Sequence, residues 1–163
     1  MRKFRSGFGL VLCVIVVAMG FTGSSAVAAP GASTRGLATK ASKTVSLRIG
    51  TKGDEMAFNK TKLSAPAGAS IKLIFKNDSK TLQHNFVLAK PGTAEEVANA
   101  GLTAGAEKSY VAESPNVIAH TKLLNSGQSE TLTFVAPSEP GDYPYICTFP
   151  GHSATMKGVL GVK

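Results

Sequence analysis

Apolar and polar residues alternate along much of the chain from residue 44 to its end. Alternation with frequent β-branched and aromatic residues is typical of half-buried strands. The strands it predicts are residues 45–49, 70–76, 85–89, 131–135 and 158–162. Turn-forming residues separate them at 65–68, 77–79, 125–127 and 137–141. This spacing predicts an all-β fold in which two sheets pack as a sandwich.

One segment departs from the strand pattern. Thr93-Ala-Glu-Glu96 matches a capping box, in which a Thr side chain and a Glu three residues later bond the first turn of a helix. Residues 97–100 continue a helical pattern, and Gly101 is a typical helix end. We therefore predict a short helix within residues 94–110 that packs outside the sheets.

The first 29 residues have the pattern of an export signal. Basic residues 1–5 precede an apolar stretch at 8–21, and small residues end the segment at Ala29. Because this stretch is shorter than the roughly 20 residues of a spanning helix, we predict a cleaved signal, with a retained N-terminal anchor as the alternative. The small and polar residues 30–43 predict a flexible linker to one domain at 44–163. The protein would then be periplasmic or peripheral on the outer face of the cytoplasmic membrane.

The charge of the chain is moderately basic. Its formal net charge is +8, and residues 1–29 contain three bases and no acid, so residues 30–163 carry +5. These bases are spread out and form no dense Lys/Arg block, which argues against nucleic-acid binding. This excess of positive charge suits a monomer that docks on acidic or membrane-associated partners.

The chemistry of the chain is concentrated at residues 147–156, which read Cys-Thr-Phe-Pro-Gly-His-Ser-Ala-Thr-Met. Cys13 lies in the predicted signal, so Cys147 would be a lone thiol in an exported protein and needs an intermolecular partner or a metal. A Cys, two His and a weak Met are the ligands of blue-copper electron carriers, and this run supplies Cys147, His152 and Met156. Pro and Gly between Cys147 and His152 favour a turn that brings both onto one ion.

The second histidine of such a site must come from another segment. His84 opens a predicted strand, and His120 follows a separate loop. Either one, taken alone, reads as an ordinary surface or core imidazole. Spacing does not choose between them.

Four stretches of the chain resemble azurin-type cupredoxins, and among these most closely the auracyanins. They are residues 56–59, 84–88, 117–124 and 143–158, and the resemblance extends over residues 44–163. It implies a cupredoxin-type Greek-key β-sandwich with a helical flap. It also implies that His84, Cys147, His152 and Met156 bind one copper ion, with the Gln83 main-chain carbonyl as a distant axial neighbour. His120 has no ligand role in this pattern.

The same resemblance implies what surrounds the ion. Asn85 would tie the His84 strand to the main chain of Thr148, next to Phe149, and hold closed the ligand loop, which is the run of residues 147–156. Electrons would leave through an apolar patch around His152; the other members of this patch are Met56, Phe149 and Pro150. No cysteine pair remains for the structural disulfide of azurins, and Gln83 replaces their usual Gly, which favours the auracyanins.

These features predict a type 1 copper protein that carries single electrons between membrane-associated redox complexes, in photosynthetic or respiratory electron transport. The implied partners are a quinol-oxidising complex and a c-type cytochrome or reaction centre. A copper oxidase or nitrite reductase would need further histidine sites, and the sequence has no His-x-His pair, so we predict no enzyme. A copper chaperone or store is the alternative, although such proteins favour Met-rich or His-rich tracts. Zinc is disfavoured because closed zinc sites rarely use Met.

Overall fold

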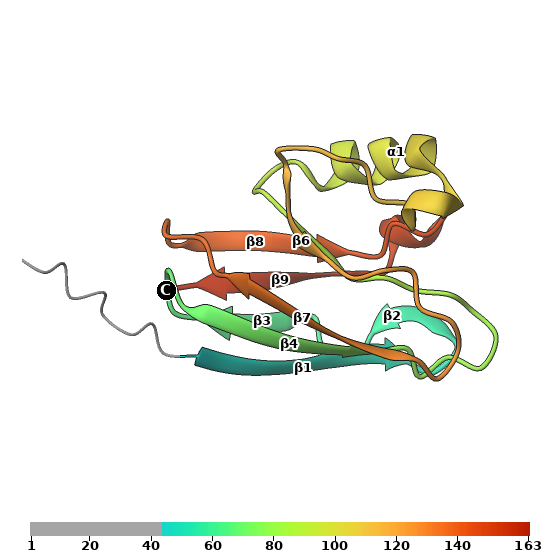
Figure 1. Cartoon of the computed structure of the whole chain (residues 1–163), viewed down its shortest axis with the longest axis horizontal. Coiled ribbons are helices and arrows are strands. Elements are labelled where there is room, and N and C mark those ends of the chain that lie inside the picture. Colours follow the sequence, from blue (N-terminus) through green and yellow to red (C-terminus); the bar gives the residue numbers. More distant parts are fainter. Residues whose placement is uncertain (1–43) are drawn as a thin grey trace, which may run out of the picture. The chain divides into compact units, whose positions relative to one another are not determined.

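Nine strands form two sheets that pack face to face in residues 44–163, the part of the chain that this computed structural model describes (Figure 1). The first sheet has the order β2-β1-β4-β7 and the second β3-β9-β8-β5-β6. The strands of the first sheet are β1 (Thr44–Lys52), β2 (Glu55–Phe58), β4 (Ser70–Lys76) and β7 (Ser129–Val135). Those of the second are β3 (Lys62–Ala65), β5 (Val87–Ala89), β6 (Val117–His120), β8 (Gly141–Ile146) and β9 (Lys157–Val162). The predicted signal and linker lie outside the described residues.

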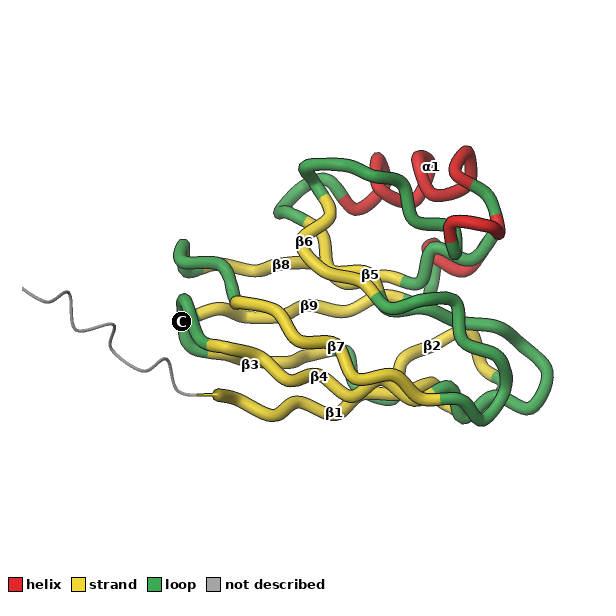
Figure 2. Tube along the Cα trace, viewed as in Figure 1, coloured by secondary structure: helices red, strands yellow, loops and turns green. Residues whose placement is uncertain are grey.

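Both sheets mix parallel and antiparallel pairs. β1 pairs with β4 in parallel, from Thr44 with Ser70 to Gly50 with Lys76, and β4 pairs with β7 antiparallel. In the second sheet β3 and β9 are parallel, and the other pairs are antiparallel. Figure 2 shows how strands distant in the sequence become neighbours. The predicted two-sheet sandwich is therefore confirmed.

The pattern located the regular strands better than the irregular ones. β4 coincides with the predicted residues 70–76, but β5 begins at Val87 and not at residue 85. Residues 84–86 instead make an isolated bridge at His84 and a bond from Phe86 N–H to the Thr121 hydroxyl. β8 was not predicted because it contains Pro144, which the strand tolerates since β5 pairs with β8 only at Tyr145 and Ile146.

Four aromatic rings form the centre of the core between the sheets. Tyr145 lies 5.1 Å from Phe86 and 5.2 Å from Phe58, and Phe58 lies 6.1 Å from Phe75, measured between ring centroids. Pairs of this kind add about 0.5–1.5 kcal/mol beyond the burial of their area. Cys147 and Met156 belong to the same apolar cluster. The predicted ligand loop is therefore packed into the core at both ends.

A helical flap lies outside the sheets, on the side of β5 and β8 (Figure 1). It consists of α1 (Ala94–Ala104), the short 3₁₀ helix η1 (Ala106–Lys108) and the turn that follows at residues 109–110. The predicted helix is confirmed, but its predicted end at Gly101 is wrong, because α1 continues to Ala104. The predicted capping box is wrong, because the Thr93 hydroxyl donates to the Lys90 carbonyl at 2.9 Å and does not cap α1. In residues 44–163, no helix has the length and apolar character that crossing a membrane requires.

Gly158 on β9 lies directly opposite Tyr145 on β8, and a Cβ atom at this position would overlap the tyrosine ring. Gly158→Ala must therefore displace a buried ring whose hydroxyl donates to the Lys60 carbonyl at 2.8 Å. We expect a loss of about 1–3 kcal/mol in the free energy of unfolding, measured by urea denaturation. Gly161→Ala on the same strand is the control, because its Cβ would meet its nearest neighbour at an ordinary 3.6 Å. Equal losses in the two variants would contradict the overlap.

Candidate metal centre

Three potential ligands converge from two segments that are far apart in the sequence. His84 precedes β5, whereas Cys147 and His152 flank the turn between β8 and β9. The Cys147 Sγ atom lies 3.8 Å from His84 Nδ1 and 3.6 Å from His152 Nδ1, and the two nitrogens lie 3.2 Å apart. Cys147 and His84 are fully buried, and His152 is 4% exposed. The residues thus form a closed group of one sulfur and two nitrogen donors.

The spacing of these donors fits a single ion between them. With the bond lengths that zinc makes to imidazole and thiolate, a tetrahedral or trigonal ion holds its ligand atoms roughly 3.3–3.8 Å apart. The two sulfur–nitrogen separations of 3.6 and 3.8 Å lie within that range, and the nitrogen–nitrogen separation of 3.2 Å lies about 0.1 Å below it. Thiolate and imidazole together suit copper, including its reduced state. The residues present therefore fit a copper ion.

Burial sets the protonation of the metal-free site. It raises the pKa of the Cys147 thiol to about 11, so the sulfur keeps its proton at neutral pH until a metal displaces it. Burial, together with the neighbouring His152, lowers the pKa of His84 to about 4, and burial also lowers the pKa of His152. Both imidazoles are therefore neutral at pH 7, the form that can bind a metal.

His84 is positioned through its main chain. Its N–H donates to the Leu124 carbonyl at 3.2 Å, and the Leu124 N–H donates back at 2.9 Å. Metal-binding histidines usually anchor their second ring nitrogen with a hydrogen bond. The His84 Nε2 atom is buried and has no hydrogen-bond partner in residues 44–163. The main-chain pairing with Leu124 fixes the backbone from which the imidazole extends.

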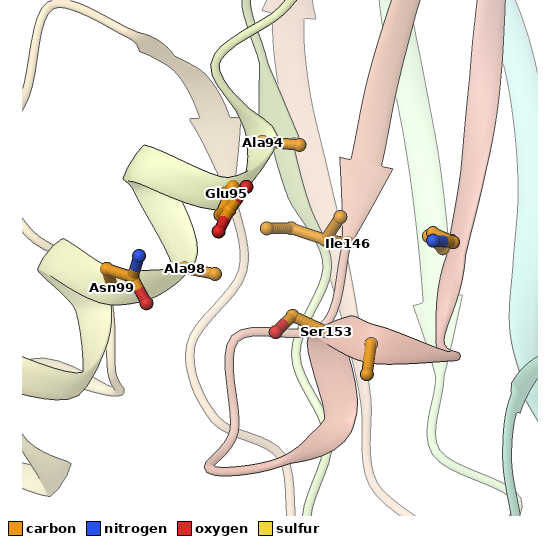
Figure 3. Close-up of a pocket in the computed structure, with 8 residues that line it drawn as sticks. Ala94, Glu95, Ala98, Asn99, Ile146 and Ser153 are labelled. Carbon is orange, nitrogen blue, oxygen red and sulfur yellow. The ribbon is translucent and has the colours of Figure 1, made fainter.

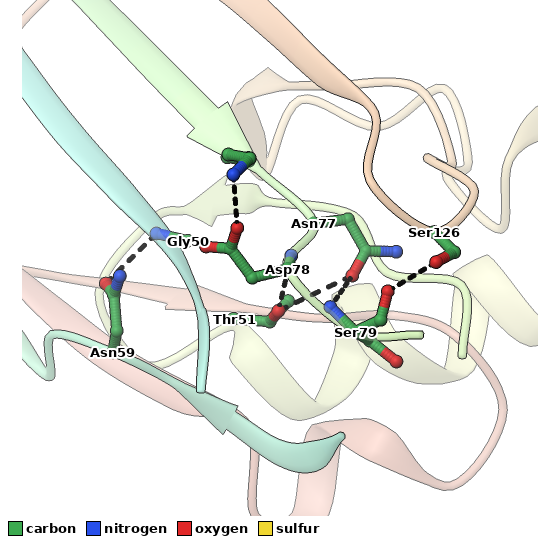
Figure 4. A network of polar contacts seen from close by, with 8 residues as sticks. Gly50, Thr51, Asn59, Asn77, Asp78, Ser79 and Ser126 are labelled. Atoms are coloured by element: carbon green, nitrogen blue, oxygen red, sulfur yellow. Dashed lines mark hydrogen bonds and ion pairs between the residues drawn. The ribbon is translucent and has the colours of Figure 1, made fainter. Parts of the chain in front are cut away.

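Asn77 fixes both segments that flank His84. Its side-chain amide donates to the carbonyls of Leu82 at 2.8 Å and Leu124 at 3.0 Å, and its oxygen accepts from the Ser79 N–H at 3.0 Å. Figure 4 shows Asn77 within a network that also contains Thr51 and Ser79. Asn77 is fully buried at the end of β4, so it connects the His84 segment to the first sheet.

The ligand loop closes on itself through main-chain bonds. The Cys147 N–H donates to the Met156 carbonyl at 3.0 Å, and the Met156 N–H donates to the His152 carbonyl at 2.8 Å. Gly151 has φ 81°, in the left-handed region that glycine adopts without strain. The predicted turn is therefore present, and it leads into the 3₁₀ helix η2 (His152–Ala154).

Asn85 links the two ligand segments to each other. Its oxygen accepts from the Thr148 N–H at 2.8 Å, the contact that the resemblance implied. Its amide also donates to the Thr148 hydroxyl and to the Ser109 carbonyl, each at 2.8 Å. The second of these acceptors belongs to the flap, so Asn85 joins three segments at one buried point.

Comparison with known proteins identifies the family of this site. The sequence profile of the copper binding proteins of the plastocyanin/azurin family matches residues 45–163. The chain belongs to this family. It is 46% identical to auracyanin-A of Chloroflexus aurantiacus over 122 residues, which cover 73% of this chain and 75% of that protein. It is 43% identical to azurin of Pseudomonas aeruginosa over 83 residues, which cover 49% and 56% of the two chains.

A solved structure supports the same assignment. Auracyanin A, described as a "blue" copper protein from the green thermophilic photosynthetic bacterium Chloroflexus aurantiacus, superposes with a TM-score of 0.70 at 45% identity. The match covers 74% of this chain and all of that one. Membership of the plastocyanin/azurin family confirms the predicted cupredoxin fold and the predicted copper cofactor. It also implies that the protein transfers electrons.

The remaining predicted site residues of this cupredoxin lie around the cluster. Met156 is fully buried in the ligand loop, and the side chain of Gln83 donates to Asn125 at 2.6 Å. Their roles as axial neighbours stay predictions. His120 is exposed on β6 and is not part of the cluster.

The residues of the predicted exit patch come from the ligand loop and from β2. The Phe149 ring lies 4.7 Å from the His152 ring, and Pro150 is exposed. Met56 is 47% exposed, and its carbonyl accepts from the Thr155 hydroxyl at 3.1 Å, so β2 contacts the ligand loop. These positions agree with a patch, whose function stays a prediction.

Three residues around this copper site were not found by sequence reasoning. Asn77 was assigned to a turn, and Ser109 and Tyr110 to the end of the helical segment. An Asn in a turn and a Tyr near a helix end are common, so their residue types carry no signal. Only their packing in the folded chain reveals what they contact.

Proposed function

We propose that this cupredoxin carries single electrons between membrane-associated redox complexes outside the cytoplasm, with His84, Cys147, His152 and Met156 holding one copper ion. The observation that carries the proposal is the buried cluster of Cys147 and the two histidines, whose donor atoms lie within 4.8 Å of one another. Copper bound there would supply a centre that accepts and returns one electron. The protein residues supply the geometry and the exclusion of water.

Fast electron transfer requires that the ligands keep their places in both redox states. The Leu124 pairing fixes His84, and the main-chain bonds at Met156 fix the loop that holds Cys147. Asn85 connects both through its contacts with Thr148. A site held by side chains that are themselves packed and bonded is pre-organised for its ion.

The exposure of the ligands favours His152 as the exit for electrons. It is 4% exposed, whereas His84 and Cys147 are fully buried. The exposed residues nearby are Met56 and Pro150, with Phe149 half-buried between solvent and the imidazole. A small patch of this kind suits brief encounters, because electron-transfer complexes bury little surface. We propose that redox partners dock here.

The nature of the partners follows from the relatives and the charge. Auracyanin A comes from a photosynthetic bacterium, which supports a place in photosynthetic electron transport. The donor would be a membrane quinol-oxidising complex, and the acceptor a c-type cytochrome or reaction centre. The net charge of +5 over residues 30–163 favours acidic partners or membrane surfaces. The signal-like residues 1–29 would export the chain, and if retained they would hold it at the membrane.

The proposal is tested on the copper-loaded protein by its visible spectrum and by cyclic voltammetry. We expect intense visible absorption from the thiolate bound to copper, and one reversible one-electron wave. A copper store or chaperone would bind the metal without a reversible wave, and this outcome would reject the carrier function. Absence of the visible band would reject the ligand assignment itself.

Met156→Leu is expected to leave copper bound and to change its reduction potential. In blue-copper sites the axial ligand tunes the potential, while the two His and the Cys hold the ion. Leucine has a volume close to that of methionine, so the cost in stability stays below about 1.5 kcal/mol. Cyclic voltammetry measures the potential, and metal analysis confirms the copper content. An unchanged potential would exclude Met156 as an axial ligand.

A further inference from the structure

Two consecutive residues of the flap have an unusual main-chain conformation. Ser109 and Tyr110 both have φ 56°, in the left-handed region that is unfavourable for residues with a Cβ atom. A bulky residue such as Tyr rarely adopts this conformation, and residues that do so are concentrated at functional sites. The turn therefore requires contacts that hold it in place.

The contacts that hold this turn come from three directions. Asn85 donates to the Ser109 carbonyl at 2.8 Å, and the Tyr110 N–H donates to the Gly105 carbonyl at 2.9 Å. Gly101 of α1 lies so close that a Cβ atom there would overlap the Tyr110 carbonyl. The same Cβ would lie 3.3 Å from the Thr148 Cβ, so the turn, α1 and the ligand loop meet here.

The turn places the Tyr110 ring against the ligand loop. Its centroid lies 5.5 Å from that of Phe149, edge to face, and the Phe149 centroid lies 4.7 Å from that of His152. Tyr110 and Phe149 are half-buried, whereas His152 is nearly covered. The three rings form a row of contacts that begins at the flap surface and ends on the imidazole.

The rest of the flap does not cover the loop in this way. A surface hollow of about 410 Å³ lies beside the first half of α1, lined by Glu95 and Ala98 on the helix and by Ile146 and Ser153 opposite. Figure 3 shows these helix residues facing Ile146 and Ser153 across the hollow. The flap therefore contacts the ligand loop through its second half, at Gly101 and Tyr110.

We propose that Tyr110 is a positioning residue of the copper site, whose ring holds Phe149 against His152 and keeps water from the imidazole. The inference rests on the proposed role of His152 as a ligand. Water and dielectric around a metal site control its reduction potential. Oxidised copper carries one more positive charge than reduced copper, so admitting water stabilises the oxidised form. Removing the ring should therefore lower the potential.

Tyr110→Gly and Ser109→Gly form a matched pair for the test. Each replaces a residue in the left-handed main-chain conformation by glycine. Glycine adopts this conformation without strain, so both variants should fold. Only Tyr110→Gly removes a ring. Ser109→Gly keeps the contact with Asn85, because that contact uses the main-chain carbonyl of Ser109 and not its side chain. Tyr110→Phe restores the ring without the hydroxyl and should restore the parent properties.

The first readout needs no copper. Hydrogen–deuterium exchange at the ring carbon between the two nitrogens, followed by mass spectrometry, reports the access of water to each histidine. In Tyr110→Gly we expect exchange at His152 to accelerate several-fold, while the fully buried His84 serves as internal reference. The parent rate in Ser109→Gly and Tyr110→Phe would support the proposal. An unchanged rate at His152 in Tyr110→Gly would overturn it.

The second readout is the reduction potential of the copper-loaded variants. We expect a lower potential in Tyr110→Gly and the parent potential in Ser109→Gly and Tyr110→Phe. A purely structural role would change the two glycine variants alike, and that result would also overturn the proposal. Should the parent protein itself lack the blue band, the carrier function fails, whereas the exchange experiment still decides the position of Tyr110.

Discussion

Cys147→Ser should abolish the intense visible absorption of the copper-loaded protein. The band arises when charge moves from the thiolate to copper, and a serine hydroxyl offers no such donor. Cys147 supplies the sulfur atom of the cluster, which lies 3.6 Å from His152 Nδ1 and 3.8 Å from His84 Nδ1. Serine is smaller than cysteine, and the Cys147 main chain keeps its bond to the Met156 carbonyl, so the fold should survive. The loss of colour would then reflect the missing thiolate ligand and not unfolding of the protein.

The measurement is a visible spectrum of metal-loaded protein, with circular dichroism to verify the fold. His120→Gln is the matched control at a histidine outside the cluster, exposed on β6, and should keep the full band. Persistence of strong absorption in Cys147→Ser would show that another group is the chromophore. Loss of the band in His120→Gln would show that the ligand set differs from the one assigned here.

How far the sequence predicts this protein depends on whether a contact is local. The strand at 70–76 alternates because one of its faces is buried, so its bounds could be predicted to the residue. The turn at Cys147 to His152 was predictable because Pro150 restricts the main chain locally and Gly151 permits the left-handed conformation of a turn. β8 could not be predicted, because Pro144 is tolerated through the limited pairing with β5, a property of the sheet.

The choice of His84 over His120 shows the same limit within the site. Nothing in the spacing of the two histidines favours either, and resemblance to a family had to decide. The structure separates them because Asn85, next to His84, bonds Thr148 of the ligand loop, whereas His120 lies exposed on β6. At Thr93, in contrast, the local sequence pattern itself gave a wrong prediction. The pattern matched a cap, but the Thr93 hydroxyl donates to the Lys90 carbonyl of the preceding turn, and its oxygen accepts no bond from the first turn of α1.

Asn85→Leu is expected to cause the largest loss of stability. The Asn85 side chain is fully buried and bonds the Thr148 N–H, the Thr148 hydroxyl and the Ser109 carbonyl, each at 2.8 Å. Leucine has a similar volume and bonds none of them. Each buried polar group left without a partner costs about 1–3 kcal/mol. We expect the free energy of unfolding to fall by about 3–5 kcal/mol, near the upper end for single substitutions.

Urea denaturation of the copper-free protein measures this loss, and Asn99→Leu is its control. Asn99 lies exposed on α1, so the same chemical change there should alter stability by no more than about 0.5 kcal/mol. A second effect follows if the variant still binds copper. Because Asn85 also holds Ser109, its loss releases the turn that places Tyr110, and the reduction potential should fall as in Tyr110→Gly. A variant as stable as Asn99→Leu would show that Asn85 does not hold the three segments together.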